Sequence, residues 1–511
     1  MEGARLERSL VFAGFMGAGK TTCAGEAARL LGVPLRDTDE QLTAALGEPI
    51  EDLWAREGEA AFREREEQVV LEALAGPPGV VSLGGGALGS ARVREALAEH
   101  VVVLVEVGLE TAWSRVAGTT RPLAQDRAAF DVLYAERESG YRAAARATLP
   151  RSGIDIVRGA LPSLVALASR QADGLRLLWA TSASGDYPVW IGAGAIGAPW
   201  PLAPPSRRIV VSDANVAELH AGRVPLLAGL VEIAAGEEHK TLATAEAVWR
   251  ALVEQGVTRA DHVVAVGGGV VGDVAGFCAA TYQRGIPVVQ VPTTLVAQVD
   301  SAYGGKTGVD LPEAKNYVGA YHQPAAVLVD PEVLSTLPPE EFAAGYAEVV
   351  KTALIAGGPL WEAVGSGCVV DEDVILACAR TKLAVVAEDE RDGGRRQVLN
   401  LGHTIGHAIE TVTGYARLRH GEAVGLGMLA ALRLSGAGDL REQVAGLLEA
   451  AGLPTFVADV DVDAVVAATH RDKKRVGEEV PFVVCLTPGD VRHGAQIAPG
   501  DVRAAVAEIA G

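Results

Sequence analysis

The stretch LNLGHTIGHAIE, from Leu399 to Glu410, has helical periodicity and places two histidines four residues apart. RHGEAV follows it at Arg419–Val424, and GYAEVVK precedes it at Gly345–Lys351. Imidazole nitrogens and carboxylate oxygens are ligands of zinc-like ions. The three segments therefore predict a helical metal site, for which they offer His403, His407, His420 and Glu348. Spacing alone selects His403 and His407, because i and i+4 side chains share one face of a helix.

A second motif lies near the other end of the chain. GFMGAGKTT, from Gly14 to Thr22, matches GxxxxGK[ST] between an apolar strand and a helix. Its backbone amides would form one phosphate cradle, Lys20 would reach the β and γ phosphates, and Thr21 would hold magnesium. We expect ATP or GTP to bind here, in contact with Gly14, Gly17, Ala18, Gly19, Lys20, Thr21 and Thr22.

The composition limits the classes of function. A chain of 511 residues predicts about three domains, and 49% apolar with 22% charged residues is typical of globular proteins. The net charge of −20 disfavours nucleic acid, which needs a basic surface, although local basic pockets could still bind small anions.

The spacing of the cysteines and the length of the apolar runs indicate the cellular compartment. The five cysteines lie far apart with no CxxC pair, which favours neither a disulfide framework nor a thiolate zinc site. No apolar run approaches the ~18 residues that span a bilayer. We therefore expect a soluble cytoplasmic protein with no membrane partner.

The order of elements predicts the fold class, α/β plus α. From Leu10 to about Gln171, short apolar strands alternate with helical segments, as in a parallel sheet covered on both faces. A second α/β series follows, and the sequence becomes strongly helical beyond Pro338. We expect a three-layer P-loop α/β domain of kinase size at 1–174, a Rossmann-like α/β domain at 175–337 and a mainly helical domain with the metal site at 338–511.

Around the phosphate loop lie residues suited to a phosphate acceptor. Asp37 and Asp39 form a DxD at a strand end, where one carboxylate can order magnesium and the other can bind a hydroxyl group. Arg63 lies on a helix, and Gly84–Gly86 ends a strand where backbone can approach a ligand. RPL at Arg121 is typical of a lid, and Arg137 lies on a later helix. Taken singly, each arginine is more often a surface residue.

The ordered set DTD, FRxxE, GGG and RPL resembles shikimate kinase from Leu10 to about Ala172, and fits it better than gluconate or adenylate kinase. The resemblance implies that shikimate is bound by Asp39, Arg63, Gly85 and Arg137. Asp39 would orient the 3-hydroxyl group and Arg121 would close over the γ phosphate. It further implies magnesium at Thr21 and Asp37, with Arg115 on the adenine.

A glycine-rich turn, VGGGVVGDVAGF at Val266–Phe277, follows a strand and opens a helix, which suits a pyrophosphate. SDANV, GEEHK and PTT lie at other strand ends. We expect a dinucleotide across the switch point of an open sheet. Its candidate contacts are Asp213, Asn215, Glu237, Lys240, Gly268, Gly269, Val270, Asp273, Thr293 and Thr294.

From about Leu175 to Gly511 the chain resembles 3-dehydroquinate synthase, through GYAEVVK, RQVLNLGHTIGHAIE, HGE, GGKTGVD and DKK. The resemblance implies NAD, and zinc or cobalt held by Glu348, His403 and His420. It leaves His407 as an acid/base or phosphate contact, a different ligand set from the one that spacing selects. It also implies a homodimer through this half.

The same resemblance implies residues for a seven-carbon keto acid phosphate. The phosphate would be bound by Arg284, Lys306, Asn316 and Lys473 or Lys474, and the carboxylate by Lys382, Arg396 and Asn400. Protons at the reacting hydroxyl groups would be carried by Asp300, Lys351 and His407, with Lys315 nearer the nicotinamide or its pyrophosphate. Asp392 stands where the family usually has a glutamate, and we expect its shorter carboxylate to serve catalysis.

Together these observations predict a bifunctional shikimate-pathway enzyme that uses ATP with Mg²⁺, NAD⁺, and Zn²⁺ or Co²⁺. One alternative is another sugar phosphate cyclase in the second half, of the valiolone or inosose type, which needs no carboxylate clamp. A second is an NAD-dependent polyol dehydrogenase. A third is that one half is a non-catalytic regulatory module, which the intact site residues of both halves disfavour.

Overall fold

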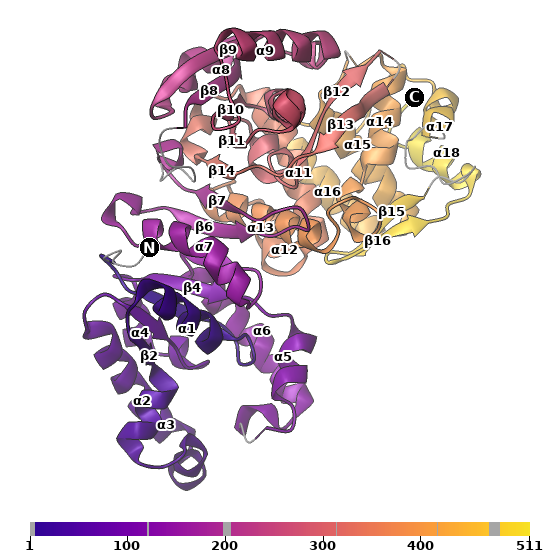
Figure 1. The fold of residues 1–511 in the computed structure, drawn as a ribbon. Helices are drawn as coiled ribbons and strands as arrows, with labels where there is room; N and C mark the ends of the chain where they lie inside the picture. The colour runs from indigo at the N-terminus through magenta and orange to yellow at the C-terminus, as the bar shows by residue number, and fades with distance from the viewer. Residues whose placement is uncertain (1–5, 120–121, 198–205, 313, 416, 470–480) are drawn as a thin grey trace. The chain divides into compact units, whose positions relative to one another are not determined.

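The computed structural model describes residues 6–119, 122–197, 206–312, 314–415, 417–469 and 481–511. Among the predicted site residues, Arg121, Lys473 and Lys474 lie outside the described residues. The chain divides into two compact units (Figure 1). We call residues 1–180 with 186–201 the N-terminal unit, and residues 181–185 with 202–511 the C-terminal unit.

The N-terminal unit contains a sheet in the order β2-β3-β1-β4-β5-β6-β7, parallel except for the antiparallel β6–β7 pair. The strands are β1 (Leu10–Ala13), β2 (Leu35–Asp37), β3 (Val80–Ser82), β4 (Val101–Val105), β5 (Ala147–Leu149), β6 (Arg176–Ala180) and β7 (Tyr187–Ile191). The helices are α1 (Lys20–Leu31), α2 (Thr38–Leu46), α3 (Ile50–Ala75), α4 (Ala91–Leu97), α5 (Leu109–Val116), α6 (Arg127–Ala144) and α7 (Ile154–Leu167).

The strands of this sheet are buried on both faces because helices cover both. All five residues of β4 are buried, and this run of valine and leucine fits a central parallel strand. Val11 and Ala13 of β1 pack in one core with residues of α3 to α6. α1 packs against β1, β3 and α7. The three-layer α/β architecture of this unit is therefore confirmed.

The C-terminal unit begins with five parallel strands in the order β14-β11-β10-β8-β9. Its strands are β8 (Arg208–Asp213), β9 (Leu227–Ile233), β10 (His262–Gly267), β11 (Val288–Pro292) and β14 (Ala326–Val329). The helices between them are α8 (Ala214–His220), α9 (Leu242–Glu254) and α10 (Gly269–Thr281). An antiparallel hairpin of β12 (Lys306–Leu311) and β13 (Ala314–Tyr321) follows β11. The strand order changes direction between β8 and β10, and this switch point is the Rossmann-like feature that the sequence predicts.

The rest of the C-terminal unit is mainly helical, as predicted. Its helices are α11 (Pro339–Ala356), α12 (Gly358–Gly365), α13 (Glu372–Glu388), α14 (His403–Val412), α15 (His420–Leu434), α16 (Gly438–Ala450), α17 (Val462–Thr469) and α18 (Pro499–Ala507). A hairpin of β15 (Phe482–Thr487) and β16 (Asp490–Ala495) lies between α17 and α18 in the sequence. No helix of the described residues is long and apolar enough to cross a bilayer.

Glycines allow α11, α14 and α15 to pack unusually closely. A Cβ atom on Gly421 of α15 would lie 1.9 Å from the carbonyl oxygen of Ala344 in α11. A Cβ atom on Gly427 would lie 1.9 Å from the carbonyl oxygen of Gly402, the residue before α14. Since neither backbone atom can move far, only glycine fits at these two crossings. The close packing places the three helices that carry Glu348, His403 and His420 side by side.

The compact units do not coincide with the predicted domain limits. Strands β6 and β7 belong to the N-terminal unit, although we expect the NAD domain to begin at residue 175. The predicted limit at 337/338 falls inside the C-terminal unit, between β14 and α11. The limits 1–174, 175–337 and 338–511 stay predictions about the evolutionary domains.

His262 gives the C-terminal unit a pH-dependent stability. Burial, with a smaller effect of Arg208, lowers the pKa of this 4%-exposed imidazole to about 4 from 6.5. The unfolded chain therefore binds a proton between these pH values that the folded chain excludes, so stability is present above pH ~6.5 and falls as the pH approaches 4. The loss should be about 3 kcal/mol.

We expect His262→Asn to flatten this dependence, measured by urea unfolding of the C-terminal unit from pH 7 to pH 4. His493→Asn, at an exposed histidine of β16, is the control and should keep the slope. An unchanged slope in His262→Asn would contradict this assignment.

Candidate active sites

The phosphate loop has the geometry that its sequence predicts. Gly17 and Gly19 adopt positive φ values of 80° and 85°, and α1 begins at Lys20. A Cβ atom on Gly19 would lie 2.7 Å from the side chain of Ser152, so the loop has no space for a larger residue there. The Lys20 Nζ atom lies 3.2 Å from the carbonyl oxygen of Phe15 within the loop. Arg115 also holds the loop, because it donates to the carbonyl oxygen of Gly17 over 2.8 Å.

Asp37 connects the phosphate loop to α2. Its Oδ2 atom accepts a 2.9 Å hydrogen bond from the hydroxyl group of Thr21. Its Oδ1 atom caps α2 by accepting from the backbone N–H groups of Asp39 and Glu40. The two residues predicted to hold magnesium are therefore in contact, and Asp39 lies in the first turn of the helix that Asp37 caps.

The remaining predicted acceptor residues meet around Gly84–Gly86. A Cβ atom on Gly84 would lie 2.6 Å from the Asp39 carboxylate, and one on Gly86 would lie 1.9 Å from the Arg63 guanidinium group. Arg137 donates to the carbonyl oxygen of Gly85 over 3.0 Å. Four residues that lie far apart in the sequence are thus brought together. Arg121 is not among the described residues.

Two further residues of this site were not predicted. Glu66 pairs with Arg63 over 2.6 Å and also lies 2.6 Å from a Cβ atom placed on Gly84. Burial raises the pKa of Glu66, against the effect of Arg63. Tyr141 donates its hydroxyl hydrogen to the Gly85 carbonyl oxygen beside Arg137. The signal for Glu66 was the glutamate of the FRxxE motif. The signal for Tyr141 was its spacing, because it follows Arg137 by four residues and so lies on the same face of the helix.

In the C-terminal unit, the glycine-rich turn lies between β10 and α10. Gly268 is the N-cap of α10, and a Cβ atom there would lie 2.9 Å from the side chain of Thr294. The backbone N–H of Thr293 donates to the carbonyl oxygen of Gly267 over 2.9 Å. Asp213 caps α8 at the end of β8 by accepting from the backbone N–H groups of Asn215 and Val216. The predicted cofactor residues thus lie at neighbouring strand ends of one sheet.

A charged cluster surrounds Lys240, which is 4% exposed. Its Nζ atom lies 2.6 Å from Asp273 and donates to the side-chain oxygen of Asn316 over 2.6 Å. Burial alone would lower the pKa of Lys240, but Asp273 and Glu237 outweigh it, so the pKa is raised. Lys315 lies 3.6 Å from Glu237. Predicted cofactor and substrate contacts are therefore adjacent, and Asp310, which accepts from the Asn316 N–H over 2.7 Å, was not predicted.

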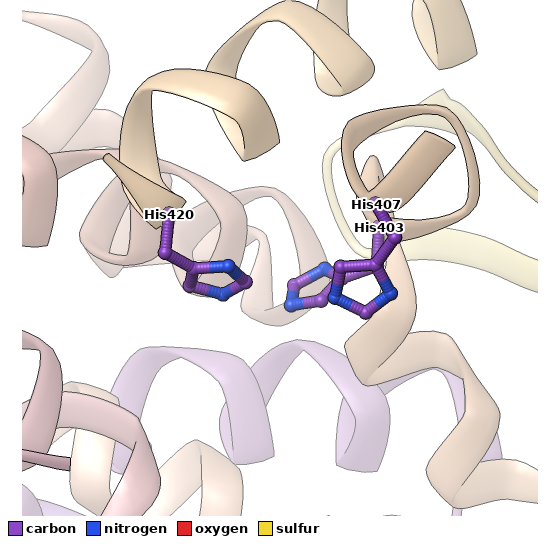
Figure 2. Close-up of side chains that lie close together, drawn as sticks. All are labelled: His403, His407 and His420. Atoms are coloured by element: carbon purple, nitrogen blue, oxygen red, sulfur yellow. The ribbon is translucent and has the colours of Figure 1, made fainter. Parts of the chain in front are cut away.

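Three histidine rings converge in the helical part (Figure 2). His403 and His407 come from α14, and His420 is the first residue of α15. One ring nitrogen of each lies within 4.8 Å of the others. The carboxylate of Glu348, from α11, lies beside them, with Oε1 3.7 Å from the Nε2 atoms of both His403 and His420.

The donor set around Glu348 fits a divalent cation. Glu348 is 1% exposed and pairs through Oε2 with Lys351. Its Oε1 atom accepts no hydrogen bond from any described residue. A buried carboxylate oxygen without a partner is costly unless an ion binds it, and two imidazole nitrogens beside it complete a zinc-type set. His407 reaches the same space, so geometry alone also permits the pair selected by spacing.

Glu410 is a buried residue beside this cluster that the sequence did not single out as a site. Burial would raise its pKa, but the hydrogen bond from His420 and the charges of His420, Lys315 and His407 lower the pKa to about 2. Its Oε1 atom lies 3.5 Å from His420 Nδ1 and 3.5 Å from Lys315 Nζ. The carboxylate is therefore ionised at neutral pH.

Asp300 lies at the centre of a charged network next to the candidate metal ligand Glu348. It lies in the short π-helical segment Ala297–Ser301 and pairs with Lys351 over 3.1 Å and with Lys382. Burial would raise the pKa of Asp300, but the two lysines outweigh it and hold the pKa well below its usual value. Burial lowers the pKa of Lys382 despite Asp300. Since Lys351 also pairs with Glu348, this network is in direct contact with one of the candidate metal ligands.

Other predicted substrate residues lie around Arg396, which is 1% exposed. Its guanidinium group donates to the carbonyl oxygens of Gly304, over 3.0 Å, and Glu390. Lys306 pairs with Asp392 over 2.6 Å, and Asp392 has a positive φ of 61°. Asn400 ends the short helix Arg395–Asn400 that carries Arg396.

Arg284 stands apart from these residues. It is exposed and has a positive φ of 68°, between α10 and β11. Within the described residues, its side chain makes no hydrogen bond or ion pair with the Asp300 network or with Lys306 and Asn316. Its predicted role at the phosphate stays a prediction.

Comparison with known proteins identifies both units. Family models of 3-dehydroquinate synthase, N-terminal and C-terminal, match residues 230–344 and 345–475. A 3-dehydroquinate synthase from Halorhodospira halophila is 43% identical over 343 residues, which cover 64% of this chain and 97% of that protein. This chain belongs to the 3-dehydroquinate synthase family. The 3-dehydroquinate synthase from Caulobacter vibrioides is 45% identical over 312 residues, covering 56% of this chain and 84% of that protein.

The N-terminal unit has a separate relationship. The shikimate kinase family model matches residues 16–155, so this part is a shikimate kinase domain. The chain is therefore a fusion of shikimate kinase with 3-dehydroquinate synthase, as the sequence predicts.

Solved structures agree with the synthase fold. A 2-epi-5-epi-valiolone synthase from Streptomyces hygroscopicus, with NAD⁺ and Zn²⁺ bound, is 26% identical with a TM-score of 0.59. A 2-deoxy-scyllo-inosose synthase complexed with carbaglucose-6-phosphate, NAD⁺ and Co²⁺ is 26% identical with a TM-score of 0.58. Each comparison covers 65% of this chain and 99% of the solved chain.

The contact between Gly86 and Arg63 gives a test of the shikimate site. In Gly86→Ala the new Cβ must displace the Arg63 guanidinium group, which is the mobile end of a long side chain, so the unit should still fold. If Arg63 binds the shikimate carboxylate as predicted, the displaced guanidinium group loses these charge-assisted hydrogen bonds. The KM for shikimate should then rise about tenfold or more, with the KM for ATP little changed. Gly89→Ala, where a Cβ atom meets no atom within 4 Å, is the matched control. Equal kinetics in the two variants would refute the placement of Arg63.

Proposed function

We propose that the N-terminal unit phosphorylates the 3-hydroxyl group of shikimate with ATP, through the residues gathered around the phosphate loop. Lys20 binds the β and γ phosphates, and Asp39 accepts a hydrogen bond from the attacking hydroxyl group and orients it. Arg63 and Arg137 bind the shikimate carboxylate through charge-assisted hydrogen bonds. Thr21 and Asp37 hold magnesium, which neutralises charge on the transferred phosphate. The contact of Thr21 with Asp37, over 2.9 Å, carries this proposal.

For the C-terminal unit we propose cyclisation of 3-deoxy-D-arabino-heptulosonate 7-phosphate to 3-dehydroquinate with release of phosphate. The residues at Asp213, Gly268, Lys240 and Thr293 hold NAD⁺, while Glu348, His403 and His420 hold zinc or cobalt. These groups supply a reversible hydride acceptor and a Lewis acid. The single observation that carries this proposal is the Glu348 Oε1 atom, 3.7 Å from two imidazole nitrogens and without a hydrogen-bond partner among the described residues.

The protein side chains position the substrate and move its protons. Asp300, Lys351 and His407 face the reacting hydroxyl groups, and the low pKa of Asp300 keeps it ionised as an acceptor. Lys306, Asn316 and Arg284 bind the phosphate, and Lys382, Arg396 and Asn400 bind the carboxylate. Asp392 holds Lys306 in place over 2.6 Å, which accounts for a carboxylate at this position. Lys473 or Lys474 adds a further cation to the phosphate.

The carboxylate contacts distinguish this substrate from those of other sugar phosphate cyclases. Arg396 and Lys382 supply cations that a substrate without a carboxylate does not need. Turnover of the heptulosonate phosphate should therefore greatly exceed turnover of sedoheptulose 7-phosphate. The reverse preference would move the C-terminal unit to the valiolone class.

We also propose that the chain acts in the cytoplasm as a homodimer through its C-terminal unit. The family resemblance supports the dimer, and five free cysteines are compatible with a reducing compartment. Sedimentation equilibrium of the full chain would test the dimer.

Crossed variants should separate the two activities. Glu348→Gln should reduce phosphate release from the heptulosonate phosphate by about 100-fold or more, because even residues around metal ligands are worth about 10–100-fold. Asp39→Asn should abolish shikimate phosphorylation. Each variant is the control for the other, since each should retain the activity of the unchanged unit. Unchanged phosphate release in Glu348→Gln would remove this metal ligand from the proposal.

Selective chelation gives an independent test. Treatment with 1,10-phenanthroline in excess Mg²⁺ should abolish the synthase activity and leave the kinase activity intact. Of the two proposed metal sites, the imidazole-rich site suits zinc-type ions, whereas the oxygen ligands Thr21 and Asp37 suit magnesium. Addition of Zn²⁺ or Co²⁺ should restore the synthase. Synthase activity that survives full removal of transition metals would contradict a metal-dependent reaction.

A further inference from the structure

Glu410 occupies an unusual position for a glutamate in α14. It is 2% exposed and lies seven residues after His403, so both side chains project from the same face of the helix. None of the roles proposed above uses it. A buried carboxylate is costly unless charged or hydrogen-bonded groups compensate it, so its environment needs a physical explanation.

The partners of Glu410 explain its burial. Its Oε1 atom lies 3.5 Å from His420 Nδ1 and 3.5 Å from Lys315 Nζ. Lys315 comes from β13, lies 3.6 Å from Glu237 and stands 4.5 Å from the centre of the Tyr415 ring. The Lys315 ammonium group and the His420 imidazole therefore both lie at the same oxygen and together compensate the charge of the carboxylate.

His420 lies between two carboxylates, with one at each ring nitrogen. Its Nε2 atom is 3.7 Å from Glu348 Oε1, and its Nδ1 atom is 3.5 Å from Glu410 Oε1. A carboxylate at Nδ1 favours the tautomer with the hydrogen on that nitrogen. The lone pair of Nε2 then points to the side where Glu348 and His403 lie. This is the carboxylate–histidine–metal arrangement by which proteins orient metal ligands.

We propose that Glu410 is a positioning residue of the metal site, which fixes the tautomer and the ring orientation of His420. The inference rests on the proposed Glu348, His403 and His420 ligand set. Glu410 itself contacts neither metal nor substrate in this scheme. It acts through His420, and the Lys315 ammonium group compensates its charge.

The test compares Glu410→Gln with Glu422→Gln in the full-length protein. Gln keeps the size of the side chain at 410 but removes the charge and offers an amide that can rotate. Glu422 is the matched control, because it lies in the first turn of the same helix as His420 yet caps that helix by accepting from the Arg419 N–H over 2.8 Å. Zinc affinity is measured by competition with a chromophoric chelator, and cobalt coordination by visible absorption.

Glu410→Gln should bind zinc about 10–100-fold more weakly than the natural chain, as is typical when an outer carboxylate partner is lost. Its cobalt spectrum should change in band position or intensity. Glu422→Gln should match the natural chain in both measurements, and Glu410→Asp should recover part of the lost affinity. Metal-free Glu410→Gln should stay folded at the assay temperature, although loss of the ionised carboxylate should lower its melting temperature.

Other results would overturn the inference in distinguishable ways. If the natural chain binds zinc tightly and Glu410→Gln matches it in affinity and cobalt spectrum, Glu410 does not position His420. If metal-free Glu410→Gln is unfolded at the assay temperature, its weaker zinc binding follows from unfolding, and the role of Glu410 is structural. If the natural chain binds neither zinc nor cobalt, the proposed metal site itself fails, and Glu410 has no ligand to position.

Discussion

The synthase site depends on the close approach of three helix backbones. Gly421 and Gly427 remove the side chains that would separate α15 from α11 and from the start of α14. At these crossings a single methyl group would meet a carbonyl oxygen at 1.9 Å, far inside van der Waals contact. The helices can therefore bring Glu348, from α11, to within 3.7 Å of His403 and His420. Without this packing the candidate ligands would remain separate surface groups of separate helices.

The buried charged groups of the synthase site compensate one another. The helices bury Glu348, Glu410, Lys351 and Asp300 near one another, and each carboxylate lies beside a lysine or an imidazole. Burial alone would move the pKa values of the acids upward and those of the bases downward, but opposite charges reverse most of these shifts. Such a network is costly to build and would be retained for binding and proton transfer rather than for stability.

Hydrophobic periodicity predicts only part of this protein, and the motifs and the family resemblance predict a further part. Apolar runs such as Val101–Val105 and the two glycine-rich turns predict parallel strands. These signals can be read from short segments, because a strand buried on both faces needs a continuous apolar run. Spacing on α14 finds His403 and His407 but not Glu348, since contacts between helices leave no periodic signal. That ligand set came from family resemblance. Glu66 and Glu410 were not assigned as site residues, because burial and pairing decide their importance, and a single sequence shows neither. The compact units also have other limits than the predicted domains, because β6 and β7 belong to the N-terminal unit, and the domain limits stay predictions.

In the kinase unit, Asp37 performs two tasks with its two oxygens. One holds the hydroxyl group of Thr21 in the phosphate loop, and the other caps the helix that begins with Thr38 and Asp39. Thr21, which is proposed to hold magnesium, and Asp39, which is proposed to bind the acceptor hydroxyl group, are thus linked through one carboxyl group. A shift of α2 that moved Asp39 would also move Asp37, and this would disturb the hydrogen bond between Asp37 and Thr21 in the phosphate loop. Under the proposed assignment, a change of acceptor specificity that leaves the phosphate loop undisturbed would arise at Arg63, Arg137 and the Gly84–Gly86 turn.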